Sequence, residues 1–312
     1  MCTTNNKLVN LQRTYHYVQE VAAERKRRHS MPNEIGSTFV CLPECCAFMG
    51  SSGAQTISAA ESIELDALKQ YPSARCLIAH LFSVWISVGG FPERRPFSGS
   101  LAESSSGEKL NTRPELISNT HFLISPEGKI ASELYRKMHL FDAPVVGLQE
   151  SLTTAAGSEV VTASVEGWNV GLSVCYDLRF PELYQAMRFP GQSAPVRAAP
   201  VDRNGVEMIL VPSAFACKTG AAHWEVLLRA RAIETQCFVI AAAQSGRHNE
   251  KRVSYGHSMI VDPWGTVVAQ FGTDSPDEGV LYAEISKSML ESVRTSMPVH
   301  VSNALRVNPS ST

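Results

Sequence analysis

Residues 172–181 read LSVCYDLRFP, and this stretch marks the point where an apolar strand meets a helix. The run from Trp168 to Val174 alternates in the manner of a half-buried strand, and Pro181 followed by Glu182 is typical of a helix start. Cys175 is therefore predicted to lie on a sharp strand-to-helix connection, where rigid neighbours hold its side chain. A nucleophile benefits from that placement, although a lone cysteine is more commonly a buried and inert one.

Two charged residues occupy comparable positions elsewhere in the chain. Glu44 follows the short apolar run Phe39 to Leu42, and Lys137 follows the segment 130–136. Each alone is typical of a solvated residue at the rim of a buried segment. Together with Cys175 they are the parts that acyl transfer through a cysteine requires. The carboxylate can take the thiol proton and return it to the leaving amine, and the fixed cation can stabilise the oxyanion of the tetrahedral intermediate.

Three motifs carry a resemblance to a known family: PE at 43–44, YRKMHLFD at 135–142 and CYDLRFPELY at 175–184. They resemble the catalytic motifs of the nitrilase superfamily of carbon–nitrogen hydrolases. The stretch from 222 to 269 closely resembles the Nit branch, whose members act as deaminated glutathione amidases. The resemblance runs from the first residues to about 285. It implies an α/β fold, a four-layer αββα sandwich with internal pseudo-twofold symmetry, in a domain over 1–290 followed by a tail at 291–312.

The resemblance also implies a role for individual residues. Cys175 becomes the nucleophile, Glu44 the general base and Lys137 the oxyanion cation of a Glu–Lys–Cys triad. The backbone N–H of Tyr176 becomes a second oxyanion donor, which suits its place beside the nucleophile. Glu150 is the candidate for a further glutamate that hydrogen-bonds the catalytic lysine and helps to orient the substrate.

Two positions resemble those that hold the carboxylate of 2-oxo acid amides, namely Arg179 and the Thr219-Gly220 pair. A guanidinium suits this task because its planar fork can bind a carboxylate through two hydrogen bonds. The alternative for Arg179 is a structural salt bridge.

The activity that the resemblance implies is hydrolysis of the amide bond of deaminated glutathione to 2-oxoglutarate and Cys-Gly. An ω-amidase acting on 2-oxoglutaramate is the enzymatic alternative, since the two substrates share the 2-oxo acid and differ in the leaving group. A non-catalytic binding protein that has kept the fold is the alternative from another class. The intact Glu44, Lys137 and Cys175 argue against it.

The composition agrees with a single large α/β domain. The chain has 312 residues, of which 44% are hydrophobic and 19% charged, and its net charge of −2 gives no electrostatic reason to bind nucleic acid or a membrane. The expectation is a cytoplasmic homo-oligomer, dimer or tetramer, that acts on a small-molecule amide without a cofactor; a mitochondrial form follows if the true start lies upstream. Eight cysteines are present, but the C-x3-C-C spacing of Cys41, Cys45 and Cys46 lacks the paired geometry of zinc sites, so neither metal nor disulfides are expected.

Periodicity predicts two long helices with an apolar face. The first spans residues 7–21 and has Leu8, Leu11, Tyr15 and Val18 on one side; the second spans 224–236 and has Val226, Leu227, Ala230 and Ile233 in the core. The family's first strand is missing before the first helix, so no strand is expected before residue 6.

Three further segments carry expectations. SPEGKI at 125–130 and DPWGTV at 262–267 are similar turns between apolar strands, with a positive φ expected at each glycine. Their similarity reflects either common turn chemistry or the internal symmetry. Residues 188–204 are expected to be an inserted surface loop, and residues 92–113 a polar, mobile loop near the cleft.

Overall fold

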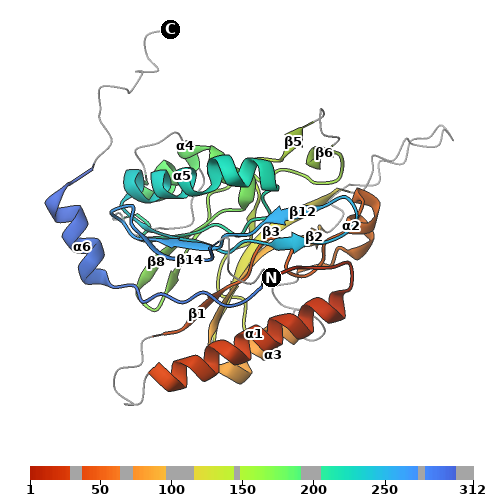
Figure 1. Ribbon diagram of the computed structural model, residues 1–312, viewed down its shortest axis with the longest axis horizontal. Helices are drawn as coiled ribbons and strands as arrows, with labels where there is room; N and C mark the ends of the chain where they lie inside the picture. Colours follow the sequence, from red (N-terminus) through yellow and green to blue (C-terminus); the bar gives the residue numbers. More distant parts are fainter. Residues whose placement is uncertain are drawn as a thin grey trace, which may run out of the picture.

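The computed structural model describes residues 1–28, 37–63, 73–95, 116–143, 148–190, 205–272 and 278–299. Two β-sheets lie face to face between two layers of helices: α1 (Lys7–Arg28) and α3 (Ser73–Phe82) cover one sheet, and α4 (Pro181–Arg188) and α5 (Cys217–Thr235) cover the other (Figure 1). The predicted αββα sandwich is confirmed. The loop predicted at 92–113, the insertion at 188–204 and the tail at 291–312 lie wholly or partly outside the described residues.

The first sheet has four strands in the order β1 (Phe39–Cys41), β2 (Trp85–Arg94), β3 (Ile117–Ile124) and β4 (Tyr135–Arg136). β1 runs parallel to β2, and the other neighbours are antiparallel. The helix α2 (Gly53–Ala59) packs near β2. β2 is buried along almost its whole length, which agrees with a strand that is covered on both faces.

The second sheet has six strands, and its three central strands are parallel. Its order is β14 (Val267–Gln270), β13 (Met259–Val261), β10 (Phe238–Ala241), β9 (Met208–Leu210), β8 (Trp168–Leu172) and β7 (Thr162–Val165). Two small hairpins lie outside both sheets, β5 (Asp142–Ala143) with β6 (Leu148–Gln149) and β11 (Ser245–Arg247) with β12 (Val253–Tyr255). The remaining elements are the 3-10 helices η2 (Glu150–Leu152) and η3 (Cys175–Arg179) and the helix α6 (Lys287–Ser296).

The two similar turns adopt the predicted conformation. Gly128 has φ +75° and donates its N–H to the carbonyl of Ser125 at 2.9 Å. Gly265 has φ +91° and donates to the carbonyl of Asp262 at the same distance. Because one turn belongs to each sheet region, the repeat agrees with the pseudo-twofold arrangement that the resemblance implies.

A bulge in β2 places Gly89 against Pro212 and Gly90 against Glu44. The pairing register with β3 shifts between Val88 and Phe91, and Gly90 within this bulge has φ +66°. A Cβ on Gly90 would lie 2.4 Å from the Glu44 Cγ, and a Cβ on Gly89 would lie 2.1 Å from the Pro212 Cγ. Only glycine therefore fits at these two positions.

The predicted core faces of the two long helices are only partly right: Val18 is buried and Leu11 and Leu227 pack against the core, but other predicted positions are exposed. On α1, Leu8 is 64% exposed and Tyr15 is 41% exposed. The buried positions of α1 are Asn10, Thr14, Val18 and Val21. The Asn10 side chain explains the difference, because it donates to the carbonyls of Thr4 and Ala47 and so turns a polar stripe inward.

On α5 the inward face is also set by polar anchors. Val226 is 68% exposed and Ile233 is 43% exposed, whereas Trp224, Leu228 and Ala232 are buried. Trp224 donates its indole N–H to the His257 carbonyl at 2.7 Å, and Arg231 donates to the Leu178 carbonyl. These hydrogen bonds, together with the buried Leu228 and Ala232, set the inward face of the helix. Within the described ranges, no helix has both the length and the apolar character needed to cross a bilayer.

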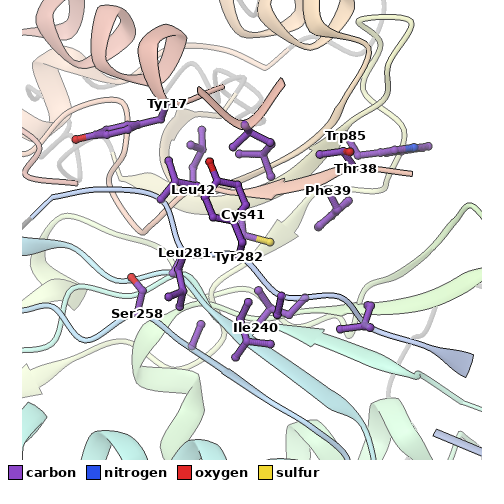
Figure 2. Close-up of a pocket in the computed structure, with 18 of the residues that line it drawn as sticks. Tyr17, Thr38, Phe39, Cys41, Leu42, Trp85, Ile240, Ser258, Leu281 and Tyr282 are labelled. Carbon is purple, nitrogen blue, oxygen red and sulfur yellow. The ribbon is translucent and has the colours of Figure 1, made fainter. Parts of the chain in front are cut away.

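A cavity of about 770 Å³ lies between the sheets beside β1. Figure 2 shows Cys41 and Leu42 on one side of it and Ile240 and Leu281 on the other. β1 is the edge strand of its sheet, and residues 279–285 line the cavity without belonging to a strand; residues 1–6 form no strand either. The cavity thus combines a largely apolar lining with an edge of β1 that no described strand pairs with, and an added strand can join an edge of this kind.

An apolar strand of about ten residues joined ahead of Met1 is expected to raise the Tm by about 5 °C or more. Met1 lines the cavity, so an extension ahead of Met1 starts at the cavity wall. About three buried apolar side chains contribute roughly 1.5–3 kcal/mol each, and 1 kcal/mol corresponds to about 2–4 °C in a large domain. Calorimetry measures the shift, with a Gly/Ser extension of equal length as the control. Equal midpoints for the two would show that the cavity does not take a strand.

Candidate active site

Three strand ends from both sheets bring the candidate site together. In the first sheet, β1 ends shortly before Glu44 and β4 ends directly before Lys137. In the second sheet, β8 ends three residues before Cys175. The site therefore lies where the two sheets meet, and it depends on their packing.

The backbone of Cys175 adopts a conformation that few residues take. Its φ is +48°, in the left-handed region, which costs roughly 1–2 kcal/mol for a residue with a Cβ. The strand geometry continues up to this point, because the Cys175 N–H donates to the Pro212 carbonyl at 2.9 Å. The thiol is thus presented at a sharp turn that begins η3, as the sequence predicts.

Asp177 fixes this turn through four hydrogen bonds. Its fully buried carboxylate accepts from the Val174 N–H at 2.9 Å, from the Tyr135 hydroxyl at 2.7 Å, and from both the backbone N–H and Nδ1 of His139 at 3.0 and 2.8 Å. Tyr135 and His139 lie on either side of Lys137 in sequence. Asp177 therefore ties the lysine segment of the first sheet to the cysteine turn of the second.

The ammonium of Lys137 lies between two carboxylates. Lys137 is 2% exposed; its Nζ lies 3.3 Å from Glu44 Oε1 and 2.8 Å from Glu150 Oε2. Its backbone N–H donates to the Asn119 carbonyl at 2.9 Å. The pairing of β3 with β4 therefore fixes the backbone position from which the Lys137 side chain extends. A buried cation with two carboxylate partners is held in one place and keeps its charge.

Glu150 and Asn119 complete the cluster. Glu150 begins η2, and its Oε2 also accepts from the Phe141 N–H at 2.8 Å. Asn119, in β3, donates its side-chain Nδ2 to Glu44 at 3.0 Å and to Glu150 at 3.1 Å. The structure therefore places Glu150 beside the lysine, as the resemblance implies.

The charge states of the cluster follow from burial and proximity. Burial, and then the nearby Glu44 carboxylate, raise the pKa of the Cys175 thiol well above its ordinary value. Burial also favours the neutral form of Glu44, but Lys137 and Arg252 outweigh it and lower the Glu44 pKa. Burial opposes the charge of Lys137, but Glu150 and Glu44 raise its pKa well above the ordinary value. At neutral pH the cluster thus holds a thiol, a carboxylate and an ammonium.

This arrangement can carry out nucleophilic chemistry only if proton transfer accompanies the attack. A thiol with a raised pKa is a weak nucleophile until a base removes its proton, and the adjacent Glu44 carboxylate is the available acceptor. A fixed ammonium beside the thiol can stabilise negative charge that develops on a bound carbonyl oxygen.

The substrate-binding candidates lie at the end of η3 (Arg179) and at the start of α5 (Thr219). The Arg179 guanidinium lies over the rings of Phe215 and Tyr176, 5.4 and 5.7 Å from their centroids, and its Nη1 is 3.1 Å from His223 Nδ1. No carboxylate among the described residues forms an ion pair with it, so the salt-bridge alternative finds no support there. Thr219, one turn before His223, donates its hydroxyl to the Ala216 carbonyl at 3.2 Å.

Two residues of the site, Asp177 and Asn119, are not predicted by the sequence analysis. Asp177 lies two residues after Cys175, and a charged residue in a segment that is expected to be buried could have been recognised as a candidate. Asn119 lies in an ordinary strand sequence, SNTHF, and only the spatial arrangement singles it out.

Comparison with known proteins gives a consistent result. A model of the family Carbon-nitrogen hydrolase matches residues 1–295. Deaminated glutathione amidase of Mus musculus is 38% identical over 301 residues, which cover 95% of this chain and 79% of the mouse protein. The nitrilase and fragile histidine triad fusion protein NitFhit of Drosophila melanogaster is 37% identical over 301 residues, covering 96% of this chain and 55% of the fly protein.

The fold is also found among solved structures. The crystal structure of the C. elegans NitFhit protein superimposes with a TM-score of 0.74 at 34% sequence identity, covering 96% of this chain and 62% of the worm chain. The chain thus spans little more than half the length of these two fusion proteins and about four fifths of the mouse amidase.

Proposed function

The chain belongs to the carbon-nitrogen hydrolase family, and from this premise we propose that it hydrolyses the amide bond of deaminated glutathione to 2-oxoglutarate and Cys-Gly. The observation that carries the chemistry is the buried Lys137 ammonium, held by Glu44 and Glu150 beside the Cys175 thiol. The names of the curated relatives from mouse and other animals support the choice of substrate.

In the proposed acylation step, the Cys175 sulfur attacks the amide carbonyl carbon while Glu44 takes the thiol proton. The resulting oxyanion accepts hydrogen bonds from the Lys137 ammonium and the Tyr176 backbone N–H. When the C–N bond breaks, Glu44 returns the proton to the leaving amine, and a thioester remains on Cys175.

In the proposed deacylation step, the oxygen of a water molecule attacks the thioester carbonyl carbon while Glu44 removes a proton from that water. The same oxyanion donors act again. The C–S bond then breaks, the 2-oxo diacid leaves, and the proton restores the thiol. Glu150 acts in both steps by keeping the lysine in place.

A competition assay between deaminated glutathione and 2-oxoglutaramate tests the choice of substrate. We expect a higher kcat/KM for deaminated glutathione. The reverse preference would identify the ω-amidase alternative, because the two substrates differ only in the leaving group. Turnover of neither would favour the non-catalytic binding protein.

The proposed carboxylate contact of Arg179 leads to a prediction about specificity. Arg179→Lys is expected to lower kcat/KM for 2-oxo acid amides by about tenfold or more, since an ammonium cannot reproduce the planar fork. Amides that lack the carboxylate are expected to be poor substrates, and simple aliphatic nitriles are not expected to react. Steady-state kinetics measure the ratio.

Arg229→Lys on α5 is the matched control, because Arg229 is paired with Glu225 on the surface. Its kcat/KM is expected to equal that of the parent. Comparable rates on an aliphatic monoamide and on deaminated glutathione would refute the pocket assignment and leave a general amidase.

The cellular setting is part of the proposal. We place the enzyme in the cytoplasm as a homo-oligomer, a dimer or a tetramer. Size-exclusion chromatography with light scattering measures the assembly, and fractionation of cells measures the compartment.

A further inference from the structure

The two glutamates beside Lys137 differ in how many donors they already have. Glu150 has donors on both oxygens: its Oε1 accepts from Asn119, and its Oε2 accepts from both Lys137 and the Phe141 N–H. Glu44 receives its two nitrogen donors, Asn119 and Lys137, on the same atom, Oε1. Among the described residues, no N–H or O–H donor reaches Glu44 Oε2. One carboxylate oxygen of the cluster is thus left to accept a proton.

Asn119 is the residue that makes the two carboxylates unequal. One amide nitrogen has two hydrogens, and here each goes to a different glutamate, at 3.0 and 3.1 Å. The orientation of the amide is unambiguous, because its oxygen would repel both carboxylates. The Asn119 Oδ1 is buried and has no hydrogen-bond partner among the described residues. Leaving this acceptor without a partner costs free energy. The side chain keeps this orientation because the two hydrogen bonds of its nitrogen to Glu44 and Glu150 outweigh that cost.

We propose that Asn119 is a positioning residue that holds the side chains of Glu44 and Glu150 in place and turns Glu44 Oε2 toward the Cys175 thiol. Two carboxylates that share one ammonium tend to share a proton, because like charges close together disfavour double ionisation. A donor that bridges them opposes this tendency. Asn119 thereby reserves the general-base role for Glu44. The inference rests on the proposed function of Glu44 as the base.

The lower pKa of Glu44 agrees with this proposal. Burial favours its neutral form, and the charges of Lys137 and Arg252 together with the hydrogen bonds from Cys175 and Asn119 outweigh burial. Removing Asn119 therefore moves the Glu44 pKa upward, and the acid limb of the pH–rate profile follows it.

The test uses Asn119→Ala and the isosteric Asn119→Asp. In Asn119→Ala, we expect the acid limb of the kcat/KM–pH profile to move to higher pH by about one unit. We also expect kcat to fall about tenfold or more, with KM within about threefold of the parent. Asn119→Asp replaces the bridging donor with a third carboxylate and is expected to shift the limb further. Asn169→Ala, a half-buried asparagine in β8, is the matched control and is expected to keep the parent profile.

A second readout does not depend on the substrate. The rate at which iodoacetamide alkylates Cys175, located by mass spectrometry, reports removal of the thiol proton as a function of pH. An upward shift is expected in both Asn119 variants, and a larger one in Asn119→Asp. An unshifted alkylation profile in a folded variant would overturn the role of Asn119. If instead neither amide is hydrolysed but the alkylation shift occurs, the proposed substrate fails and the role of Asn119 stands.

Discussion

Cys175→Ser is expected to fold normally and to lose at least about three decades of kcat. The change is nearly isosteric, so the bond from its backbone N–H to the Pro212 carbonyl is kept. A serine hydroxyl has a pKa far above that of a thiol, and the Glu44 carboxylate is too weak a base to activate it. Single-turnover and steady-state assays measure the loss, and circular dichroism verifies the fold.

Cys217→Ser is the control, because Cys217 is exposed at the start of α5. It is expected to keep the parent rate. Activity of Cys175→Ser within tenfold of the parent would remove Cys175 from its role. A thioester trapped on any other cysteine would do the same.

Glu44→Gln and Lys137→Ala are expected to abolish turnover for different reasons. Glu44→Gln keeps the shape of the side chain and removes proton acceptance, so binding of the substrate persists while acylation stops. Lys137→Ala removes the cation that stabilises the oxyanion, a loss on the order of 3 kcal/mol or more. It also leaves the buried Glu44 and the half-buried Glu150 without their counter-charge, which lowers the free energy of unfolding.

Pre-steady-state kinetics separate the two variants, since the release of the amine during the first turnover reports acylation. A normal acylation burst in Glu44→Gln would contradict the general-base assignment. Asp177→Asn is unsuitable as a control here, because Asp177 holds the turn that carries the nucleophile. Glu225→Gln on the surface of α5 serves instead.

The fold and the strand ends are predictable from the sequence because they depend on local patterns. An apolar run followed by a turn locates the end of a strand whatever lies across from it. That logic applies to Glu44, Lys137 and Cys175, whose segments end as predicted. It also applies to the two turns at Gly128 and Gly265, where the chemistry of Pro and Gly is sufficient.

The faces of the long helices are not predictable in the same way. On α1, Asn10 and Thr14 are buried and Leu8 is exposed, because hydrogen bonds to distant loops decide which side faces the sheet. Periodicity counts apolar residues and has no access to such bonds. Asn119 is missed for the same reason, since its two partners lie 75 and 31 residues away.

The paired glycines of the β2 bulge have a consequence for how this enzyme can diversify. Gly89 abuts Pro212, whose carbonyl holds the backbone of Cys175, and Gly90 abuts Glu44. A single added methyl at either position would push Cys175, the proposed nucleophile, or Glu44, the proposed base, away from its partner. Libraries that aim at new substrates should therefore leave residues 89 and 90 unchanged and vary the surroundings of Arg179. There the proposed contact between Arg179 and the substrate carboxylate can change while the distance between thiol and carboxylate is preserved.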